Sequence, residues 1–388
     1  MSASTKRSLI CGGGKIGRGF LGQLLHHSGY DLLLLDKDAE LVRLLNKRRA
    51  YRVETAGDDD ASETLPVAHA YTPDDRDELR ALANDIDLLV LSVGARNIEW
   101  ATKFLADVFA SRKFPLNCLI CENAQRPAET MRRILEEANS PLLTPGKLGL
   151  VETQVLRTGM LPSAEILQQD PLAVTLSKWC PLPADADAFV GDVPTIIALD
   201  PKPNFQNELR RKLFTFNGLN GPISYIGFLN GYHLLHEAAR APELQTFIED
   251  VMAESAHGLI AEYGWDPEPH LAFQQMAIDK YRDSAIKDTI ERNARDTARK
   301  LAPGERLLGP ALLCLKHGRL PRGYVVAVAA AIDYCGSDDP GTQGVQTLLR
   351  EKGIRAVLQE ICGLTDDSPI ASAVEEAWRE KAYRVSKS

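Results

Sequence analysis

The chain has 388 residues, of which 44% are hydrophobic and 25% are charged, as in ordinary globular proteins. The length suffices for two domains, and the formal net charge of −8 argues against a nucleic-acid or anionic-membrane partner. No apolar run is long enough to span a membrane, and the first residues lack the apolar segment of a secretory signal. We therefore expect a cytoplasmic protein.

Strands alternate with helices in the first 200 residues. Short apolar strands are predicted at residues 8–11, 31–35, 87–93 and 117–121, and a helix with one apolar side at residues 16–27. Further strands are predicted at residues 171–177 and 195–199. This alternation is typical of a doubly wound parallel sheet, so we predict an α/β fold with a Rossmann-type domain over residues 1–200.

Helices dominate the rest of the chain. The turn-rich residues 200–204 are followed by helical patterns at residues 243–262, 269–281, 343–352 and 370–383. We predict a second, mostly α-helical domain over residues 201–388 that carries the substrate and catalytic residues.

A glycine-rich turn lies between the first predicted strand and the first helix. Residues 12–17 read Gly-Gly-Gly-Lys-Ile-Gly and fit the fingerprint G-x-G-x-x-G. Gly12 permits the tight turn, Gly14 lets a pyrophosphate approach the backbone, and Gly17 lets helix and strand pack closely. Lys15 and Ile16 open the helix, whose free N–H groups face the phosphates. The pattern predicts a dinucleotide site.

Three further residues follow the ends of predicted strands. Asp36 ends the second strand, and a carboxylate there accepts hydrogen bonds from the ribose hydroxyls and repels a 2′-phosphate, which favours NAD over NADP. Val93 and Asn123 follow later strands, where ligands of such sheets bind, and are candidate cofactor contacts. An FAD-binding or purely structural Rossmann unit is the alternative.

Lys212, Asn217 and Asn220 form a polar group at the start of the helical domain. On an α-helix, Asn217 and Asn220 would be surface neighbours, and Lys212 would lie about one and a half turns before Asn217. Arg210 and Arg211 are adjacent cations that could lower the pKa of the Lys212 ammonium. The alternative is an exposed basic turn of an ordinary helix.

A basic group lies further along the helical domain. Arg292, Arg295, Arg299 and Lys300 have helical spacing on roughly one side. Such a face could hold a substrate phosphate through bidentate contacts, or it could be a solvated, ion-paired surface.

Several segments together carry a resemblance to a known family. They are Ile-Gly-Arg-Gly-Phe at residues 16–20, Cys-Glu-Asn at 121–123, Lys-Leu-Phe-Thr at 212–215, Arg-Lys-Leu at 299–301, Glu-Arg-Leu at 305–307 and Asp-Asp-Pro at 338–340. With these segments in the same order, the chain resembles the polyol-specific long-chain dehydrogenases (the mannitol dehydrogenase family) over nearly its whole length. The resemblance is strongest to members that act on mannitol 1-phosphate.

The resemblance implies metal-independent hydride transfer between NAD and a polyol phosphate, which would become a keto-sugar phosphate. Lys212 would match the general base and Asn217 the donor to the substrate oxygen. Asn220 would complete the catalytic group, and Glu152 would lie in the substrate site together with the basic group at residues 292–300. No metal site is expected, and the chain would be a monomer or a small homo-oligomer.

The chain departs from the family pattern in the substrate region. The family carries Lys-x4-Asn-x2-His, and Asn220 stands in place of the histidine; an amide cannot carry a proton. Glu152 stands where relatives have Asp or Asn, and Leu156 stands where they have Asp. These departures leave open a dehydrogenase of an unphosphorylated polyol or a hexuronate, or a non-catalytic NAD-binding homologue.

Overall fold

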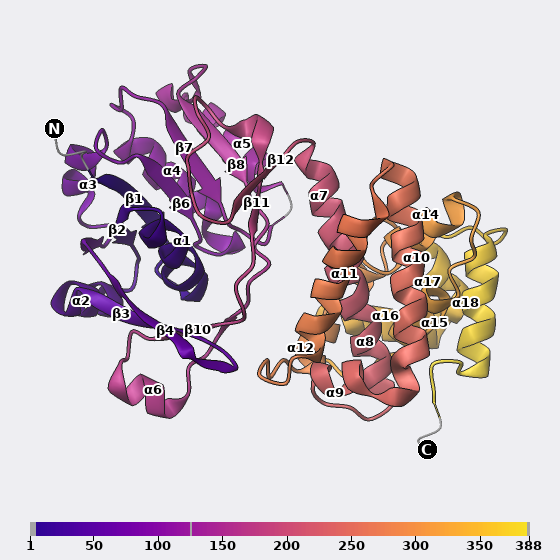
Figure 1. Ribbon diagram of the computed structural model, residues 1–388. Coiled ribbons are helices and arrows are strands. Elements are labelled where there is room, and N and C mark those ends of the chain that lie inside the picture. Colours follow the sequence, from indigo (N-terminus) through magenta and orange to yellow (C-terminus); the bar gives the residue numbers. More distant parts are fainter. Residues whose placement is uncertain (1–4, 125, 386–388) are drawn as a thin grey trace. The chain divides into compact units, whose positions relative to one another are not determined.

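The computed structural model describes residues 5–124 and 126–385, and the chain divides into two compact units (Figure 1). Unit 1 is Met1–Glu208 and unit 2 is Leu209–Ser388. The division falls inside α7 (Phe205–Lys212), eight residues beyond the boundary expected from the turn-rich segment.

Unit 1 is built on a six-stranded sheet in which every neighbouring pair is parallel. The strand order is β5 (His69–Tyr71), β2 (Tyr30–Leu35), β1 (Lys6–Cys11), β6 (Leu88–Leu91), β7 (Leu116–Ile120) and β8 (Leu148–Glu152). This order is that of a Rossmann fold, whose ligands bind beyond the carboxyl ends of the strands, where the strand order reverses between β1 and β6. The predicted fold class is confirmed.

Helices cover both faces of this sheet. Successive strand residues point to opposite faces, and since consecutive residues of these strands are apolar, both faces must be buried. Leu9 and Cys11 belong to a buried cluster with α3 (Arg76–Leu82), α4 (Ile98–Val108) and α5 (Pro127–Glu137). Ile10 faces the other side, towards the π-helix η1 (Lys15–Leu21), which continues as α1 (Gly22–His27). The helix predicted at residues 16–27 therefore begins with a wider π-helical segment.

The rest of unit 1 forms smaller elements. A second sheet has the order β4 (Asp58–Pro66), β3 (Ala50–Thr55), β10 (Val174–Leu176) and β9 (Gly159–Met160). Helices α2 (Ala39–Arg48) and α6 (Ala164–Gln169) and the 3-10 helices η2 (Ala95–Asn97), η3 (Pro141–Leu143) and η4 (Ala186–Ala188) complete the unit.

One predicted strand of unit 1 is misplaced. Strand β12 (Leu199–Lys202) pairs in parallel with β11 (Leu182–Asp185). A strand was predicted at residues 195–199, but β12 begins only at Leu199. Residues 200–204 were predicted to form a turn because they contain Pro201. An edge strand tolerates proline because its missing N–H needs no ladder partner.

Unit 2 is helical, and the helices predicted at residues 243–262, 269–281, 343–352 and 370–383 are confirmed with ends shifted by a few residues. Its elements after α7 are η5 (Leu213–Asn217), α8 (Gly218–Leu229), α9 (Leu235–Arg240), η6 (Pro242–Leu244), α10 (Gln245–Tyr263), α11 (Pro267–Arg282), α12 (Ile290–Ala294), α13 (Thr297–Lys300), α14 (Leu308–Lys316), α15 (Arg322–Asp333), α16 (Pro340–Lys352), α17 (Ile354–Glu360) and α18 (Pro369–Glu380). None of the described helices combines the length and the apolarity needed to cross a bilayer.

Helix α8 lies in the core of unit 2, and most of its residues are buried. Its glycines permit close packing: a Cβ on Gly218 would lie 2.9 Å from the Tyr324 hydroxyl, and one on Gly227 would lie 2.8 Å from Ala238. This packing holds the start of α8, and the residues before it, in place.

Candidate active site

The glycine-rich turn of unit 1 follows β1 and is held by close backbone contacts. Gly12 has a φ of +98°, and a Cβ there would lie 2.1 Å from the carbonyl oxygen of Ser92. A Cβ on Gly17 would lie 1.9 Å from the carbonyl oxygen of Gly12. Both positions therefore require glycine to form the turn itself.

Gly14 differs from these two glycines because nothing lies within 4 Å of the place where its Cβ would be. The turn itself does not need glycine here, and the open space fits the approach of a pyrophosphate. Lys15 is exposed and Ile16 is half-buried, and both lie at the start of η1. The shape and the backbone donors of this turn fit a dinucleotide.

Asp36 lies directly after β2, beside the glycine-rich turn. Its Oδ2 accepts the Gly13 N–H at 2.7 Å, and its Oδ1 accepts the Asp38 N–H at 2.9 Å. Each oxygen keeps a further lone pair, so the carboxylate can still accept hydrogen bonds from ribose hydroxyls.

Substitution of Asp36 tests this role. We expect Asp36→Asn to weaken NADH binding about tenfold and to move the preference towards NADPH, because a charged acceptor is lost and repulsion of a 2′-phosphate is relieved. Titration of both nucleotides by protein fluorescence measures the change. Asp38→Asn removes the same charge from the N-cap of α2 and is the matched control; equal effects of the two substitutions would contradict a specific role for Asp36.

The ends of β6 and β7 are tied together by Glu122, which sequence reasoning did not single out. Its Oε1 accepts the N–H groups of Val93 at 2.6 Å and of Gly94 at 3.0 Å, and burial raises the pKa of this carboxyl. The Val93 N–H therefore has a partner within the protein, whereas Asn123 is exposed at the same edge of the sheet. Cofactor contacts of Val93 and Asn123 stay predictions.

Glu152 ends β8 and is buried. Its Oε1 accepts the Ala128 N–H at 3.0 Å in the first turn of α5, and its Oε2 accepts from Gln206 Nε2 at 3.4 Å. Burial raises the pKa of this carboxyl above its usual value. Glu152 thus stabilises the start of a helix, and its role in substrate binding stays a prediction.

In unit 2, Lys212 and Asn217 bracket one wide turn of helix. Residues Leu213–Asn217 form the π-helix η5, in which an N–H bonds the carbonyl five residues earlier. The spacing Lys-x4-Asn therefore equals one π-turn and brings both residues to one side of the helix. The prediction of one and a half α-helical turns between them was wrong, because the sequence spacing was interpreted with the α-helical period.

The ammonium of Lys212 lies in a cationic region. Burial, followed by the charges of Lys280 and Arg306, lowers the pKa of Lys212 to about 8. The expectation that Arg210 and Arg211 would do this is corrected: Arg210 donates to the Tyr263 hydroxyl, and Arg211 donates to the Pro269 carbonyl. Sequence neighbours on a helix point in different directions, whereas Lys280 and Arg306 come from other elements.

Asn220 is buried one turn after Asn217, at the start of α8. Its Nδ2 donates to Asn293 Oδ1 at 3.1 Å, and the Asn293 carbonyl accepts from Lys300 Nζ. Burial, with the charges of Arg306 and Arg299, lowers the pKa of Lys300 to about 7. Where relatives have histidine, this chain therefore has an amide linked through Asn293 to a buried, titratable lysine.

The basic group at residues 292–300 does not form one helical face. Asp296, with a φ of +62°, separates α12 from α13, so the predicted single helix is wrong. The arginines are paired with carboxylates of unit 2 and exposed, whereas Lys300 is buried. The pairs are Arg292 with Asp288 at 2.7 Å, Arg295 with Glu291 at 3.5 Å, and Arg299 with both Asp296 and Glu305.

Acidic and sulfur ligands do not gather into a metal centre in the part of the chain that the structure describes. No three His, Cys, Asp or Glu side chains within residues 5–124 and 126–385 are arranged to hold an ion. Independence of a metal stays a prediction.

The parallel sheet, the glycine-rich turn and Asp36 define a Rossmann-type, dinucleotide-binding protein. Comparison with known families agrees: residues 6–197 match the mannitol dehydrogenase Rossmann domain, and residues 206–382 match the mannitol dehydrogenase C-terminal domain. The chain belongs to the mannitol dehydrogenase family of NAD-dependent polyol dehydrogenases. The family and the cofactor predicted from the sequence are confirmed.

Solved structures show the same fold at low sequence identity. The chain is similar to Pseudomonas fluorescens mannitol 2-dehydrogenase, solved as a ternary complex with NAD and D-mannitol (TM-score 0.72, 16% identity, 98% of this chain and 93% of that chain covered). It is also similar to a D-sorbitol dehydrogenase in substrate-free form (TM-score 0.81, 14% identity, 97% and 93% covered).

Proposed function

We propose that this protein oxidises the phosphate ester of a polyol such as mannitol 1-phosphate to a keto-sugar phosphate with NAD, and that Lys212 is the general base. The observation that carries this proposal is the position of Lys212, which shares one π-turn with Asn217 and has a pKa lowered to about 8. A base must lose its proton near working pH, which an ordinary lysine does not.

Different residues of unit 2 act on the proton and on the oxygen of the alcohol. Neutral Lys212 Nζ takes the hydroxyl proton, and the Asn217 amide donates to the same oxygen as negative charge develops on it. The glycine-rich turn and Asp36 would hold NAD, which when bound would supply the acceptor for the hydride of the carbinol carbon. Asn220 contributes its Oδ1 as an acceptor for a substrate hydroxyl, because its Nδ2 already donates to Asn293.

A phosphorylated substrate is supported by the charges around Lys212. Lys280 Nζ lies 5.9 Å from the centre of the Phe216 ring in η5, and the Arg306 side chain packs beside Gly221 of α8. Arg306 acts on both Lys212 and Lys300, since its charge lowers the pKa of each. Arg306 Nε is itself paired with Glu305 Oε2 at 3.3 Å. A dianionic phosphate would interact favourably with these cations, whereas an uncharged polyol would not.

Steady-state kinetics on a matched pair of substrates tests the phosphate. We expect kcat/KM for mannitol 1-phosphate to exceed that for mannitol by at least about 100-fold, since two charge-assisted contacts contribute roughly 3 kcal/mol. Arg306→Gln should raise the KM for the phosphate ester about tenfold and leave that for mannitol unchanged.

Arg295→Gln is the matched control for Arg306→Gln, because both arginines are paired with a glutamate, but Arg295 is exposed and is not among the charges that lower the pKa of Lys212. Equal kcat/KM for the two substrates would contradict the phosphate proposal and favour an unphosphorylated polyol. The structures of enzymes named for mannitol and sorbitol motivate that second candidate.

A further inference from the structure

Hydroxyl groups from three helices of unit 2 bond the carbonyls of the π-turn that follows Lys212. Ser255 Oγ of α10 donates to the Phe214 carbonyl at 2.8 Å, and the Tyr281 hydroxyl of α11 donates to the Phe216 carbonyl at 2.8 Å. The Tyr324 hydroxyl of α15 donates to the carbonyl of Gly218, one residue beyond the turn, at 3.0 Å and lies 3.4 Å from the Phe214 carbonyl within it. These hydroxyls come from segments far apart in the sequence, and all three meet the same turn.

A π-turn inside an α-helix needs such support. The wider turn interrupts the regular ladder of backbone hydrogen bonds, so carbonyls near the junction need other donors. Phe214 and Phe216 are buried, and a buried carbonyl without a donor is costly. The hydroxyls therefore favour the π-turn over a rewound α-helical turn.

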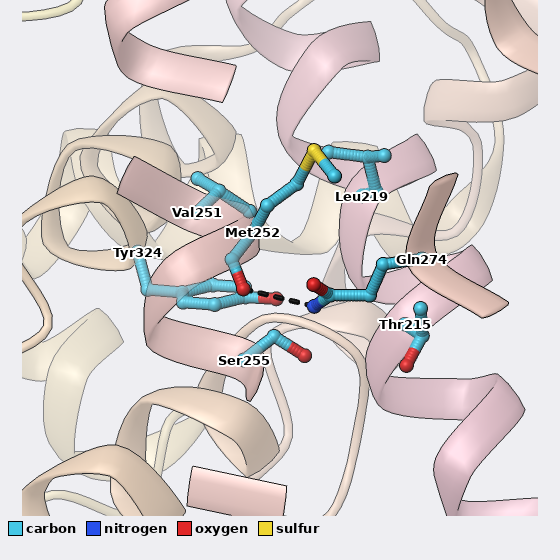
Figure 2. Close-up of a pocket in the computed structure, with 7 residues that line it drawn as sticks. All are labelled: Thr215, Leu219, Val251, Met252, Ser255, Gln274 and Tyr324. Atoms are coloured by element: carbon cyan, nitrogen blue, oxygen red, sulfur yellow. Dashed lines mark hydrogen bonds between the residues drawn. The ribbon is translucent and has the colours of Figure 1, made fainter. Parts of the chain in front are cut away.

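The space beside Ser255 and Tyr324 leaves no room for a water molecule. Figure 2 shows a pocket lined by Thr215 of η5 together with Ser255, Gln274 and Tyr324, in which the Gln274 amide donates to the Met252 carbonyl. The gap between these atoms does not admit a water molecule, and Thr215 Oγ1 has no hydrogen-bond partner among the described residues. Within this pocket, therefore, no water molecule shares the bonding of the turn with the Ser255 and Tyr324 hydroxyls.

The width of the turn decides where Lys212 and Asn217 point. Residues five apart in an α-helix lie roughly 140° apart around the axis, whereas in a π-turn they lie one above the other. If residues 213–217 formed a regular α-helical turn instead, the Asn217 side chain would point away from the substrate oxygen that Lys212 Nζ contacts.

We infer that Tyr281 and Ser255 are positioning residues, whose hydroxyls hold the π-turn so that Lys212 Nζ and the Asn217 amide address one substrate oxygen. This inference rests on the proposed function of Lys212 as base. Tyr281 is the sharper probe, because its ring also contacts Phe216 edge-on at 6.4 Å and would remain in Tyr281→Phe.

The experiment compares Tyr281→Phe and Ser255→Ala with Tyr334→Phe. Tyr334 is fully buried in the same unit, and its hydroxyl has no hydrogen-bond partner among the described residues, so it is the matched control. Two readouts are taken: kcat for mannitol 1-phosphate oxidation across pH, and the titration midpoint of Lys212 by NMR after ¹³C-methylation of lysines, assigned with Lys212→Arg. Thermal unfolding confirms that each variant is folded at the assay temperature.

We expect Tyr281→Phe to lower kcat about 10- to 100-fold and to move the Lys212 midpoint up by about one pH unit, with smaller changes in the same direction for Ser255→Ala. Tyr334→Phe should leave both unchanged. A lower melting temperature with wild-type kcat and midpoint in both test variants would overturn the inference. If the wild type oxidises no polyol or polyol phosphate, the proposed function fails, and the Lys212 midpoint still decides the positioning role.

Discussion

Lys212→Ala is expected to lower kcat for polyol phosphate oxidation by about 10²–10⁴-fold, which is the usual contribution of a general base. Binding of NADH should be unchanged, because the glycine-rich turn and Asp36 lie in unit 1 and Lys212 lies in unit 2. Rapid-mixing measurements of NADH formation, with NADH affinity measured separately by fluorescence, distinguish loss of chemistry from loss of cofactor.

The pH dependence of the wild type supplies the second part of this prediction. Oxidation requires the neutral amine, so its rate should rise with pH and level off above the Lys212 pKa of about 8. The reverse reduction requires the ammonium and should slow over the same range. Lys280→Gln removes a neighbouring positive charge, so it should raise the Lys212 pKa and move the midpoint to higher pH.

Two outcomes would contradict the role of Lys212 as the base. One is a Lys212→Ala variant whose kcat is within a few-fold of the wild type. The other is a wild-type profile whose midpoint does not move in Lys280→Gln.

Substitutions of Gly14 and Gly17 are expected to act on different properties. A Cβ on Gly17 would meet the Gly12 carbonyl oxygen at 1.9 Å, so Gly17→Ala should lower the free energy of unfolding by about 3 kcal/mol even without nucleotide. Gly14 has a φ of −70° and open space around its Cβ position. Gly14→Ala should therefore keep the stability of the apoprotein and weaken NADH binding at least tenfold, by about 1.4 kcal/mol or more.

Urea unfolding without ligand and NADH titration measure these two effects separately. Gly146→Ala, which also has open space but lies on a distant loop with positive φ, serves as a control for loss of a glycine without an effect on NADH. If Gly14→Ala binds NADH as tightly as the wild type, the nucleotide does not approach the backbone at this turn.

The sequence predicted the strand–turn–helix–strand segment of unit 1 well because its signals are local. Gly12, Gly17 and Asp36 lie within one strand–turn–helix–strand segment, and each has a steric or electrostatic reason that is independent of distant residues. Glu122 was not predicted as a site residue, although its segment, residues 121–123, was among those that carry the family resemblance. Its contact with Val93 and Gly94 depends on β6 and β7 being neighbours in the sheet, which the sequence does not show.

The helical unit was harder to predict, for two physical reasons. Ser255, Tyr281 and Tyr324 donate hydrogen bonds to the π-turn and its end from other helices. The spacing of polar residues along 212–220 therefore could not reveal the turn. Likewise, the backbone at Asp296 breaks what appeared to be one basic helix, and the cations that act on Lys212 come from α11 and from the loop before α14. In both cases tertiary contacts override local spacing.

The most direct measurement of the central claim is NADH formation from NAD with a panel of hexitols and hexitol phosphates, using the wild type, Lys212→Ala and Asn220→His. We predict turnover of a hexitol phosphate by the wild type and its loss in Lys212→Ala. The claim would be contradicted by a wild type that binds NADH tightly yet oxidises no member of the panel, with no activity restored by Asn220→His.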